Sequence, residues 1–280
     1  MQQIKIKKGN VLTYIIILLC AVAIMFTLKK CSTTLPQKQE FYKRAGGDTI
    51  NVAIEISPIS LSLADDTLSG FYYEILKLIE EKNNVAFKLH QFVPLSFALD
   101  GLDSRLFDIV VADIPATSNL KEKYLLTQSL YVDHQLLVQH INESTGKVDI
   151  EDYNQLASET VWVVKNSPFI DRITNLTEEL GCDTIYVMES EEYSSEQLVI
   201  LTALGEIKRA VVNANVAKKM ARDYPQLDIN TKISFNQFQV WVLKQDNQSL
   251  CNRINEWITE IKSSKEYELI LQKYTKIEHL

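Results

Sequence analysis

The chain has 280 residues, an apolar share of 46% and a formal net charge of −7. An acidic protein has no surplus of cations with which to bind phosphates, so we do not expect nucleic acid as a partner. Of the four cysteines, Cys20 and Cys31 fall in or next to an N-terminal apolar run, which excludes a disulfide framework. The other two are Cys182 and Cys251, which either pair in an oxidising compartment or stay separate as buried thiols. The helical patterns beside them favour separate thiols.

The N-terminal segment predicts export. Residues 11–28 form an apolar run long enough to cross most of a hydrocarbon core, and three lysines before it favour a cytoplasmic N-terminus. Two anchors remain open for residues 1–31: an uncleaved signal-anchor helix, or a lipoprotein signal that ends at a lipidated Cys31. Lys29 and Lys30 stand where a lipoprotein signal carries small residues, which favours the transmembrane anchor. Either anchor places the protein at the cell membrane, facing the periplasm.

Residues 32–48 are polar and mixed in charge, which is typical of a linker. Beyond them, apolar β-rich runs alternate with helical patterns, and this order predicts an α/β fold with mainly parallel sheets covered by helices. The predicted strands are 50–56, 107–114, 135–138, 159–164, 184–188, 210–213 and 238–243. The predicted helices are 71–81, a helix-like stretch around Leu120, 169–180, 196–204, 250–261 and 267–274.

Three motifs follow one another in the first half of the folded part. They read GFYYEIL at 70–76, FDIVVAD at 107–113 with Thr117 behind it, and LTQSLY at 126–131. In this order they resemble the extracellular solute-binding protein family 3, the amino-acid-type periplasmic binding proteins. That family has a glycine-aromatic helix start, a G-x-x-D strand that leads into a threonine loop, and an F-S-x-P-Y segment. Here Ser104 replaces the glycine of the second motif and Leu130 replaces the proline of the third. The resemblance extends over nearly all of residues 48–275.

The resemblance implies a two-lobed periplasmic-binding-protein fold of type II, in which the chain crosses between α/β lobes twice and closes on a ligand in the cleft. It places the first lobe at 49–133 plus 238–280 and the second at 134–237. Within the family, the sequence is similar to the non-catalytic N-terminal region of membrane-bound lytic transglycosylases of type F, which also begin with a membrane segment. Their cell-wall-cleaving domain has no counterpart in the sequence, so we do not expect an enzyme.

Three of the anchors with which the family holds a free amino acid are replaced. The resemblance places Leu120 where an arginine clamps the carboxylate, Ala214 where an acidic side chain takes the ammonium group, and Ile59 where an aromatic ring stacks. Lys121 is one residue away from the arginine position, but its charge lacks the bidentate geometry and suits a solvated surface equally well. Because a buried charge without its partner is costly, the sequence predicts a ligand other than an ordinary free amino acid.

Mostly neutral, polar side chains remain as candidates for ligand contact, and each has a structural alternative. Asp113 and Thr117 follow the strand of the second motif, where Asp113 also suits a loop cap. Ser167 stands at a predicted helix start, where it either caps the helix or contacts a ligand. A turn at the end of a strand would equally explain Asn213 and Asn215. The full set of predicted contact residues is Asp113, Thr117, Asn166, Ser167, Ser195, Asn213 and Asn215.

The sequence shows no pattern for catalysis, a metal or a cofactor. The four histidines are scattered without the spacing of a metal site, and no nucleophile elbow or phosphate loop is present. We therefore expect a membrane-tethered, extracytoplasmic binding module for a small ligand, with peptides or cell-wall fragments suggested by the resemblance. The alternative is a degenerate, ligand-free regulatory or interaction protein that docks a partner of the cell envelope.

Overall fold

The computed structural model describes residues 49–64, 67–92, 94–142, 144–181 and 184–275. All of them fall in one structural unit, residues 44–280. The predicted anchor and linker at 1–48, with Cys31, lie outside the described residues, and so does Cys182. Cys251 is a buried free thiol. In the described part of the chain, no helix is both long and apolar enough to span a membrane.

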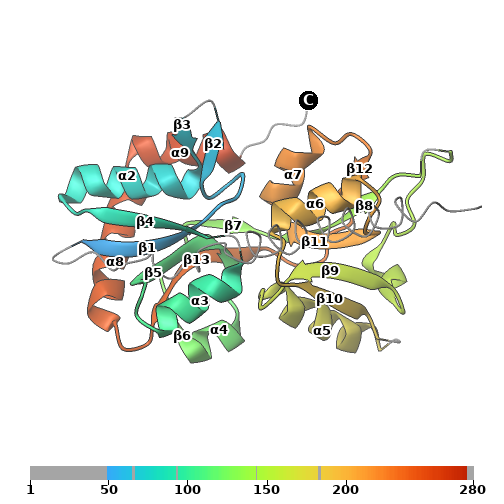
Figure 1. The fold of residues 1–280 in the computed structure, drawn as a ribbon, viewed down its shortest axis with the longest axis horizontal. Helices are drawn as coiled ribbons and strands as arrows, with labels where there is room; N and C mark the ends of the chain where they lie inside the picture. Colours follow the sequence, from blue (N-terminus) through green and yellow to red (C-terminus); the bar gives the residue numbers. More distant parts are fainter. Residues whose placement is uncertain (1–48, 65–66, 93, 143, 182–183, 276–280) are drawn as a thin grey trace, which may run out of the picture. The chain divides into compact units, whose positions relative to one another are not determined.

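Six strands form the first sheet (Figure 1). In it, β1 (Ile50–Glu55) lies between β4 (Phe87–Phe92) and β5 (Ile109–Pro115), and all three run parallel. Nearly all residues of β1 and β5 are buried, which explains why their sequences are continuous apolar runs rather than alternating ones. The antiparallel strands are β13 (Gln237–Lys244), which pairs with β5, and β6 (Tyr124–Leu126) and β7 (Tyr131–Asp133), which pair with β13.

Five strands form the second sheet. In it, β9 (Thr160–Val164) lies between β10 (Tyr186–Ser190) and β11 (Arg209–Asn213), and the three run parallel. Two antiparallel strands follow: β8 (Gln135–His140) pairs with β11, and β12 (Leu227–Asp228) pairs with β8.

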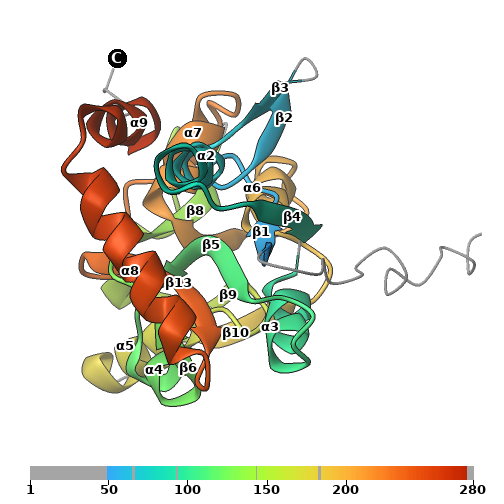
Figure 2. The same ribbon diagram turned by 90° about the vertical axis from the view of Figure 1, so that its left-hand side faces the viewer.

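Helices cover both sheets. α2 (Phe71–Asn83) buries Phe71, Tyr72, Ile75, Leu76, Leu78 and Ile79, largely at the three- to four-residue spacing of an amphipathic helix. The other helices are α3 (Leu95–Asp103), α4 (Ser118–Lys123), α5 (Phe169–Leu180), α6 (Ser195–Ala203), α7 (Ala214–Ala221), α8 (Gln248–Lys262) and α9 (Lys265–Thr275), with a short hairpin of β2 (Ser62–Ala64) and β3 (Thr67–Ser69) and a 3-10 turn at Tyr153–Leu156. In Figure 1 and again in the turned view of Figure 2, α2 and α9 lie on one side of the first sheet, and α3 and α4 lie on the other.

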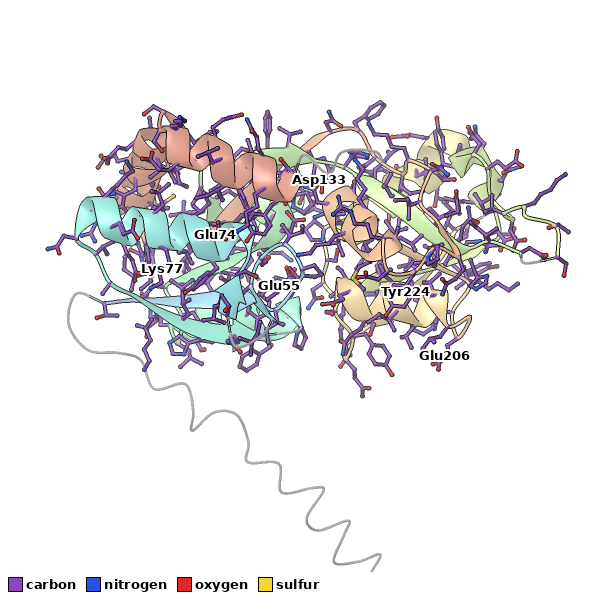
Figure 3. All side chains as sticks on the ribbon, turned by 90° about the horizontal axis from the view of Figure 1, so that it is seen from above. Glu55, Glu74, Lys77, Asp133, Glu206 and Tyr224 are labelled. Atoms are coloured by element: carbon purple, nitrogen blue, oxygen red, sulfur yellow. The ribbon has the colours of Figure 1, made fainter. Side chains whose placement is uncertain are left out.

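The chain passes between the two sheets twice. It leaves the first sheet after β7, enters the second at β8, and returns between β12 and β13. The two passages are in contact, because Gln135 Nε2 donates a hydrogen bond to Gln237 Oε1 at 2.7 Å. The view from above in Figure 3 shows Asp133 at the place where the two halves of the ribbon meet, and Glu55 lies there as well.

The predicted α/β fold is confirmed, although several elements differ from the prediction. β10 begins later than predicted and continues to Ser190. The sequence pattern does not indicate β4, α3 or α7. β4 is an edge strand with a polar side chain at three of its six positions, and α3 has only nine residues, one of which is Gly101. The polar residues of β4 interrupt an apolar run, and α3 is too short to show a helical period.

The glycine before α2 is required by the backbone. Gly70 has a φ of 138°, and its N–H donates a hydrogen bond to Tyr274 Oη at 2.9 Å. A Cβ atom at this position would lie 2.4 Å from the carbonyl oxygen of Ser60. Backbone atoms cannot move aside as a flexible side chain does, so the close approach of these two segments depends on glycine.

We predict that Gly70→Ala lowers the free energy of unfolding by about 3 kcal/mol, the combined cost of an unfavourable φ and a backbone clash. Gly146→Ala is the matched control, since Gly146 also has a positive φ, 65°, but a Cβ there would contact nothing within 4 Å. It should cost only roughly 1–2 kcal/mol. Urea unfolding of the full-length chain, followed by tryptophan fluorescence, measures both. Equal losses in the two variants would contradict the clash.

Candidate functional site

A polar groove lies between the start of α4 and the start of α5. It has two adjoining parts, with volumes of about 340 Å³ and 410 Å³, which share Thr117, Asn119, Pro168 and Asp171. Because α4 follows a strand of the first sheet and α5 a strand of the second, the groove has walls from both. We call it the α4–α5 groove. Other residues that line it include Asp100, Leu120, Lys123, Asn166, Ser167 and Arg172.

Three of the predicted ligand-contact residues meet in this groove: Thr117, Asn166 and Ser167. Thr117 caps α4, since its Oγ1 accepts the N–H of Leu120 at 3.3 Å, and Ser167, one residue before the N-cap Pro168 of α5, accepts the N–H of Phe169 with its Oγ at 3.1 Å. A hydroxyl that accepts one hydrogen bond still has a proton to donate, so capping and ligand contact are compatible. Asn166 is exposed and adopts a φ of 58°, with its side chain on the groove wall.

The groove contains a guanidinium group, but it is already bound. Arg172 Nε donates to the carbonyl oxygen of Ile233 at 2.8 Å, and its Nη1 donates to Glu179 Oε1 at 2.7 Å. Leu120, at the arginine position of the family, is one of the lining residues. Among the described residues of the groove, the remaining cation is the exposed Lys123. A bidentate clamp for a carboxylate is therefore lacking in this part of the structure.

Asp113, Asn213 and Asn215 meet at a second place, between the ends of β5 and β11. Asn213 Nδ2, from the second sheet, donates to the carbonyl oxygen of Asp113 in the first sheet at 2.9 Å. The backbone N–H of Asn215 donates to Asp133 Oδ2 at 3.1 Å, so that the Asp133 carboxylate caps α7. Asn213 and Asn215 are both buried. This is the carboxyl end of parallel strands in each sheet, the edge at which α/β proteins bind ligands.

Ser195 belongs to neither place. The side chain that caps α6 is that of Ser194, which forms a capping box with Gln197, and Ser195 is the first helical residue. Burial raises the pKa of its neighbour Glu196, and the charge of Lys219 partly offsets this increase. The Lys219 ammonium in turn donates to the carbonyl oxygen of Pro58 at 2.5 Å, a further contact between the two halves.

Glu55 is absent from the predicted set of contact residues. It is the last residue of the buried strand β1, and Asp113 has a similar place near the end of the neighbouring strand β5. Its carboxylate accepts the Ser60 hydroxyl at 3.1 Å, and the charge of Asp113 acts on it. Asp113 Oδ1 accepts the hydroxyls of Tyr72, at 3.3 Å, and Tyr131. We call Glu55, Asp113 and Asp133 the acidic junction.

Burial makes the ionised forms of the acidic junction costly. It raises the pKa of Glu55 from 4.5 to about 7 and that of Asp133 from 3.8 to about 7, and in both cases the charge of Asp113 raises the pKa further. Burial also raises the pKa of Asp113, against the lowering effect of its hydrogen bonds. Beside them, burial and two lysine charges lower the pKa of His134 to about 4, so this ring is neutral at pH 7 and offers no compensating charge.

The family model of the bacterial extracellular solute-binding proteins, family 3, matches residues 49–277. The chain belongs to this family.

Relatives and solved structures agree with this assignment. The chain is 24% identical over 197 residues to a membrane-bound lytic murein transglycosylase F of Shewanella sediminis (strain HAW-EB3), covering 70% of this chain and 40% of that protein. It is 22% identical to the protein of the same name from Aliivibrio fischeri (strain ATCC 700601 / ES114), covering 90% of this chain and 50% of that protein. The chain thus spans half or less of the length of these relatives.

The fold is similar to that of amino-acid-binding proteins. An ancestral arginine-binding protein bound to arginine superposes with a TM-score of 0.70 at 18% identity, covering 82% of this chain and 99% of that one. A putative L-cystine ABC transporter protein from Listeria monocytogenes gives a TM-score of 0.71 at 16% identity, covering 82% and 97%. At such identities the likeness concerns the fold alone.

We predict that the acidic junction makes the protein less stable as the pH rises. Glu55 and Asp133 have a higher pKa in the folded chain than in the unfolded one, so between about pH 4.5 and pH 7 the folded state binds more protons. The free energy of unfolding should therefore fall as the pH rises through this range. Glu55→Gln removes one of these groups, so the variant should lose less stability than the unmodified chain between pH 5 and pH 8. The difference is about 1.4 kcal/mol for each unit by which folding raises the pKa of Glu55.

Glu206→Gln is the control, because Glu206 is exposed and lies away from the junction (Figure 3). Urea unfolding at pH 5 and pH 8 gives the two differences. If both variants respond to pH as the unmodified chain does, the Glu55 carboxyl titrates normally in the folded protein and the prediction is wrong.

Proposed function

We propose that residues 49–275 form a two-lobed solute-binding module of type II, with one lobe around each sheet, and that it captures a small ligand other than an ordinary free amino acid. The observation that carries this proposal is the α4–α5 groove, which has walls from both sheets but carries Leu120 at the arginine position. Membership of a solute-binding family favours binding over catalysis as the activity.

The site lacks the charges that a free amino acid needs. Ala214, at the position of the family's acidic residue, is fully buried and neutral, and Ile59, at the position of the stacking ring, is part of the apolar core. A carboxylate brought to Leu120 would lose its hydration without gaining a guanidinium, and an unpaired buried charge costs several kcal/mol. The amide and hydroxyl groups of Thr117, Asn119 and Asn166 instead suit peptide bonds or sugar hydroxyls.

The names of the relatives suggest where such a ligand comes from. Lytic murein transglycosylases act on the cell wall by name, and this chain matches a part of them that is similar to a binding protein. We therefore propose a peptide or a cell-wall fragment as the ligand class. The name of the family and the membrane-bound relatives support an extracytoplasmic location, with the N-terminal apolar run as its tether.

One observation favours the alternative of a ligand-free interaction protein. The two halves are linked by direct hydrogen bonds, since Asn213 binds the carbonyl oxygen of Asp113 and Lys219 binds that of Pro58. A protein that closes on itself in this way could serve as a rigid docking module for a partner in the envelope. The groove between α4 and α5 nevertheless stays open beside these contacts, so we place ligand binding first.

We predict that free amino acids leave the unfolding temperature of the full-length chain unchanged, whereas at least one short peptide or soluble cell-wall fragment raises it. A ligand at a hundred times its dissociation constant stabilises the folded state by about 2.7 kcal/mol, which corresponds to several degrees. Thermal unfolding of the chain in mild detergent, with each compound added in turn, is the measurement.

Asn119→Trp should abolish the shift, because Asn119 is exposed and lines both parts of the groove. Asn252→Trp, at an exposed position of α8, should leave it intact. Binding of a free amino acid at micromolar concentration would contradict the proposal that Leu120 and Ala214 remove the charges that hold such a ligand. A screen in which no compound stabilises the chain would favour the interaction protein.

A further inference from the structure

The strand β10 forms an edge of the second sheet (Figure 1). Among the described residues, β9 is the strand that pairs with it. Tyr186, Met188 and Glu189 of β10 are exposed, whereas every residue of β11, in the middle of the same sheet, is buried. β10 also lacks the lysine or proline that commonly protects an edge strand from pairing with another chain. Its outer side therefore has the exposure and the composition of an edge that accepts a further strand.

The backbone of β10 offers hydrogen-bonding groups on this outer side. The N–H of Tyr186 donates to a carbonyl oxygen just before β9 at 2.9 Å, and the carbonyl oxygen of Ser190 accepts an N–H just after β9 at 2.8 Å. Both residues therefore face β9. Every second residue of a parallel strand faces the same neighbour, so Met188 faces β9 as well, while Val187 and Glu189 face the other way. Their N–H and C=O groups are what an added strand binds.

An apolar strip runs along one face of this edge. Tyr186 and Met188 point to the same face, because side chains alternate along a strand, and they are 56% and 44% exposed. Trp162, which is the partner of Met188 on β9, continues the strip and packs against the apolar cluster that includes Leu198 of α6. Val187 points to the opposite face and packs against the apolar cluster of α5. An added strand with apolar side chains on the first face would cover the strip.

The carboxyl end of the same edge is acidic. Glu189, Glu191 and Glu192 are all exposed, and residues 184–193 contain no basic residue. Lys165, just after β9, forms an ion pair with Glu191. Within the described part of the chain, Glu189 and Glu192 have no ion-pair partner. Opposite charges on neighbouring strands stabilise their pairing and like charges oppose it, so this end of the edge favours a basic segment.

Charge also decides between the possible occupants of the edge. A second copy of the chain would bring a second set of the same three glutamates into one interface, and each copy carries a net charge of −7. An extended segment with alternating apolar and basic side chains fits better. Its apolar side chains lie beside Tyr186 and Met188, and its basic side chains lie on the face of Glu189.

We propose that β10 is a docking edge for another protein, which adds an extended segment of alternating apolar and basic residues as a further strand of the second sheet. The backbone groups of Val187 and Glu189 provide hydrogen bonds that do not depend on the sequence of the partner. The apolar strip and the glutamates select the segment. This inference goes beyond the proposed function, because the residues that line the α4–α5 groove do not include any of β10.

The test is fluorescence anisotropy of a labelled seven-residue peptide in which lysine alternates with valine, titrated with the full-length chain in mild detergent at pH 7.5. We expect saturable binding that weakens at least tenfold when glutamate replaces lysine in the peptide. Two further forms carry N-methyl groups either on all lysine nitrogens or on all valine nitrogens. Only one of these two sets of N–H groups faces β10 in an added strand, so one form should bind at least tenfold more weakly than the other.

Variants locate the binding on β10. Glu189→Pro removes an outward N–H but none of the bonds to β9, so it should weaken binding at least tenfold at a nearly unchanged unfolding temperature. Glu189→Gln keeps the N–H and removes only the charge, so it should weaken binding less. Met188→Lys places a like charge in the exposed strip and should also abolish binding, which keeps the test open if the proline variant fails to fold. Leu269→Lys, at an exposed apolar position of α9, is the matched control and should bind as the unmodified chain does.

Equal binding of the two N-methylated forms would overturn the inference, since it would reduce the interaction to charge alone. Binding that survives both Glu189→Pro and Met188→Lys would overturn it as well, and so would the absence of binding by the alternating peptide. Analytical ultracentrifugation that shows a dimer of the chain, abolished by Met188→Lys, would assign the edge to a second copy and contradict the proposal of a basic partner.

Discussion

The carboxyl group of Asp113 lies between the two sheets, and the contacts that join them are organised around this residue. Asp113 is held by a hydroxyl from α2, a hydroxyl from β7 and an amide from β11, so three elements that are distant in the sequence meet at one residue. Its charge contributes to the raised pKa of Glu55 and of Asp133. Asp133, at the end of β7, in turn caps α7. The ionisation of this carboxyl group therefore affects the first turn of a helix that covers the second sheet.

This arrangement changes the charge pattern of the ligand that fits. The family resemblance describes a zwitterion held by a cation from one side and an acid from the other, whereas Leu120 and Ala214 are both neutral. Negative charge is instead concentrated on the first sheet, in Glu55 and Asp113, facing Asn213 across the junction. A zwitterion would therefore meet neither of the two opposite charges that the resemblance implies, and its charged groups would be buried without partners.

Local features of the site are predictable from the sequence, and features that depend on strand order are not. The continuous apolar runs of β1 and β5, the cap at Thr117 and the loss of the arginine at Leu120 all follow from short motifs. Glu55 has the same local signal as Asp113, an acid behind a buried strand, but its importance depends on the parallel pairing of β1 with β5. That pairing joins residues more than fifty positions apart, and no local pattern encodes it. The same reason hides the hydrogen bond of Arg172 with the carbonyl oxygen of Ile233, a residue 61 positions away.

The contacts that join the two halves are weak compared with the electrostatic cost at the junction. An intramolecular hydrogen bond contributes about 1 kcal/mol net, and those that link the halves include the bonds of Asn213 with Asp113, of Asn215 with Asp133 and of Lys219 with Pro58. Each pKa unit by which burial disfavours an ionised acid is worth about 1.4 kcal/mol, and several such units accumulate at Glu55 and Asp133. The ionised forms of these acids therefore oppose the folded arrangement, and this cost is relieved where the acids bind protons.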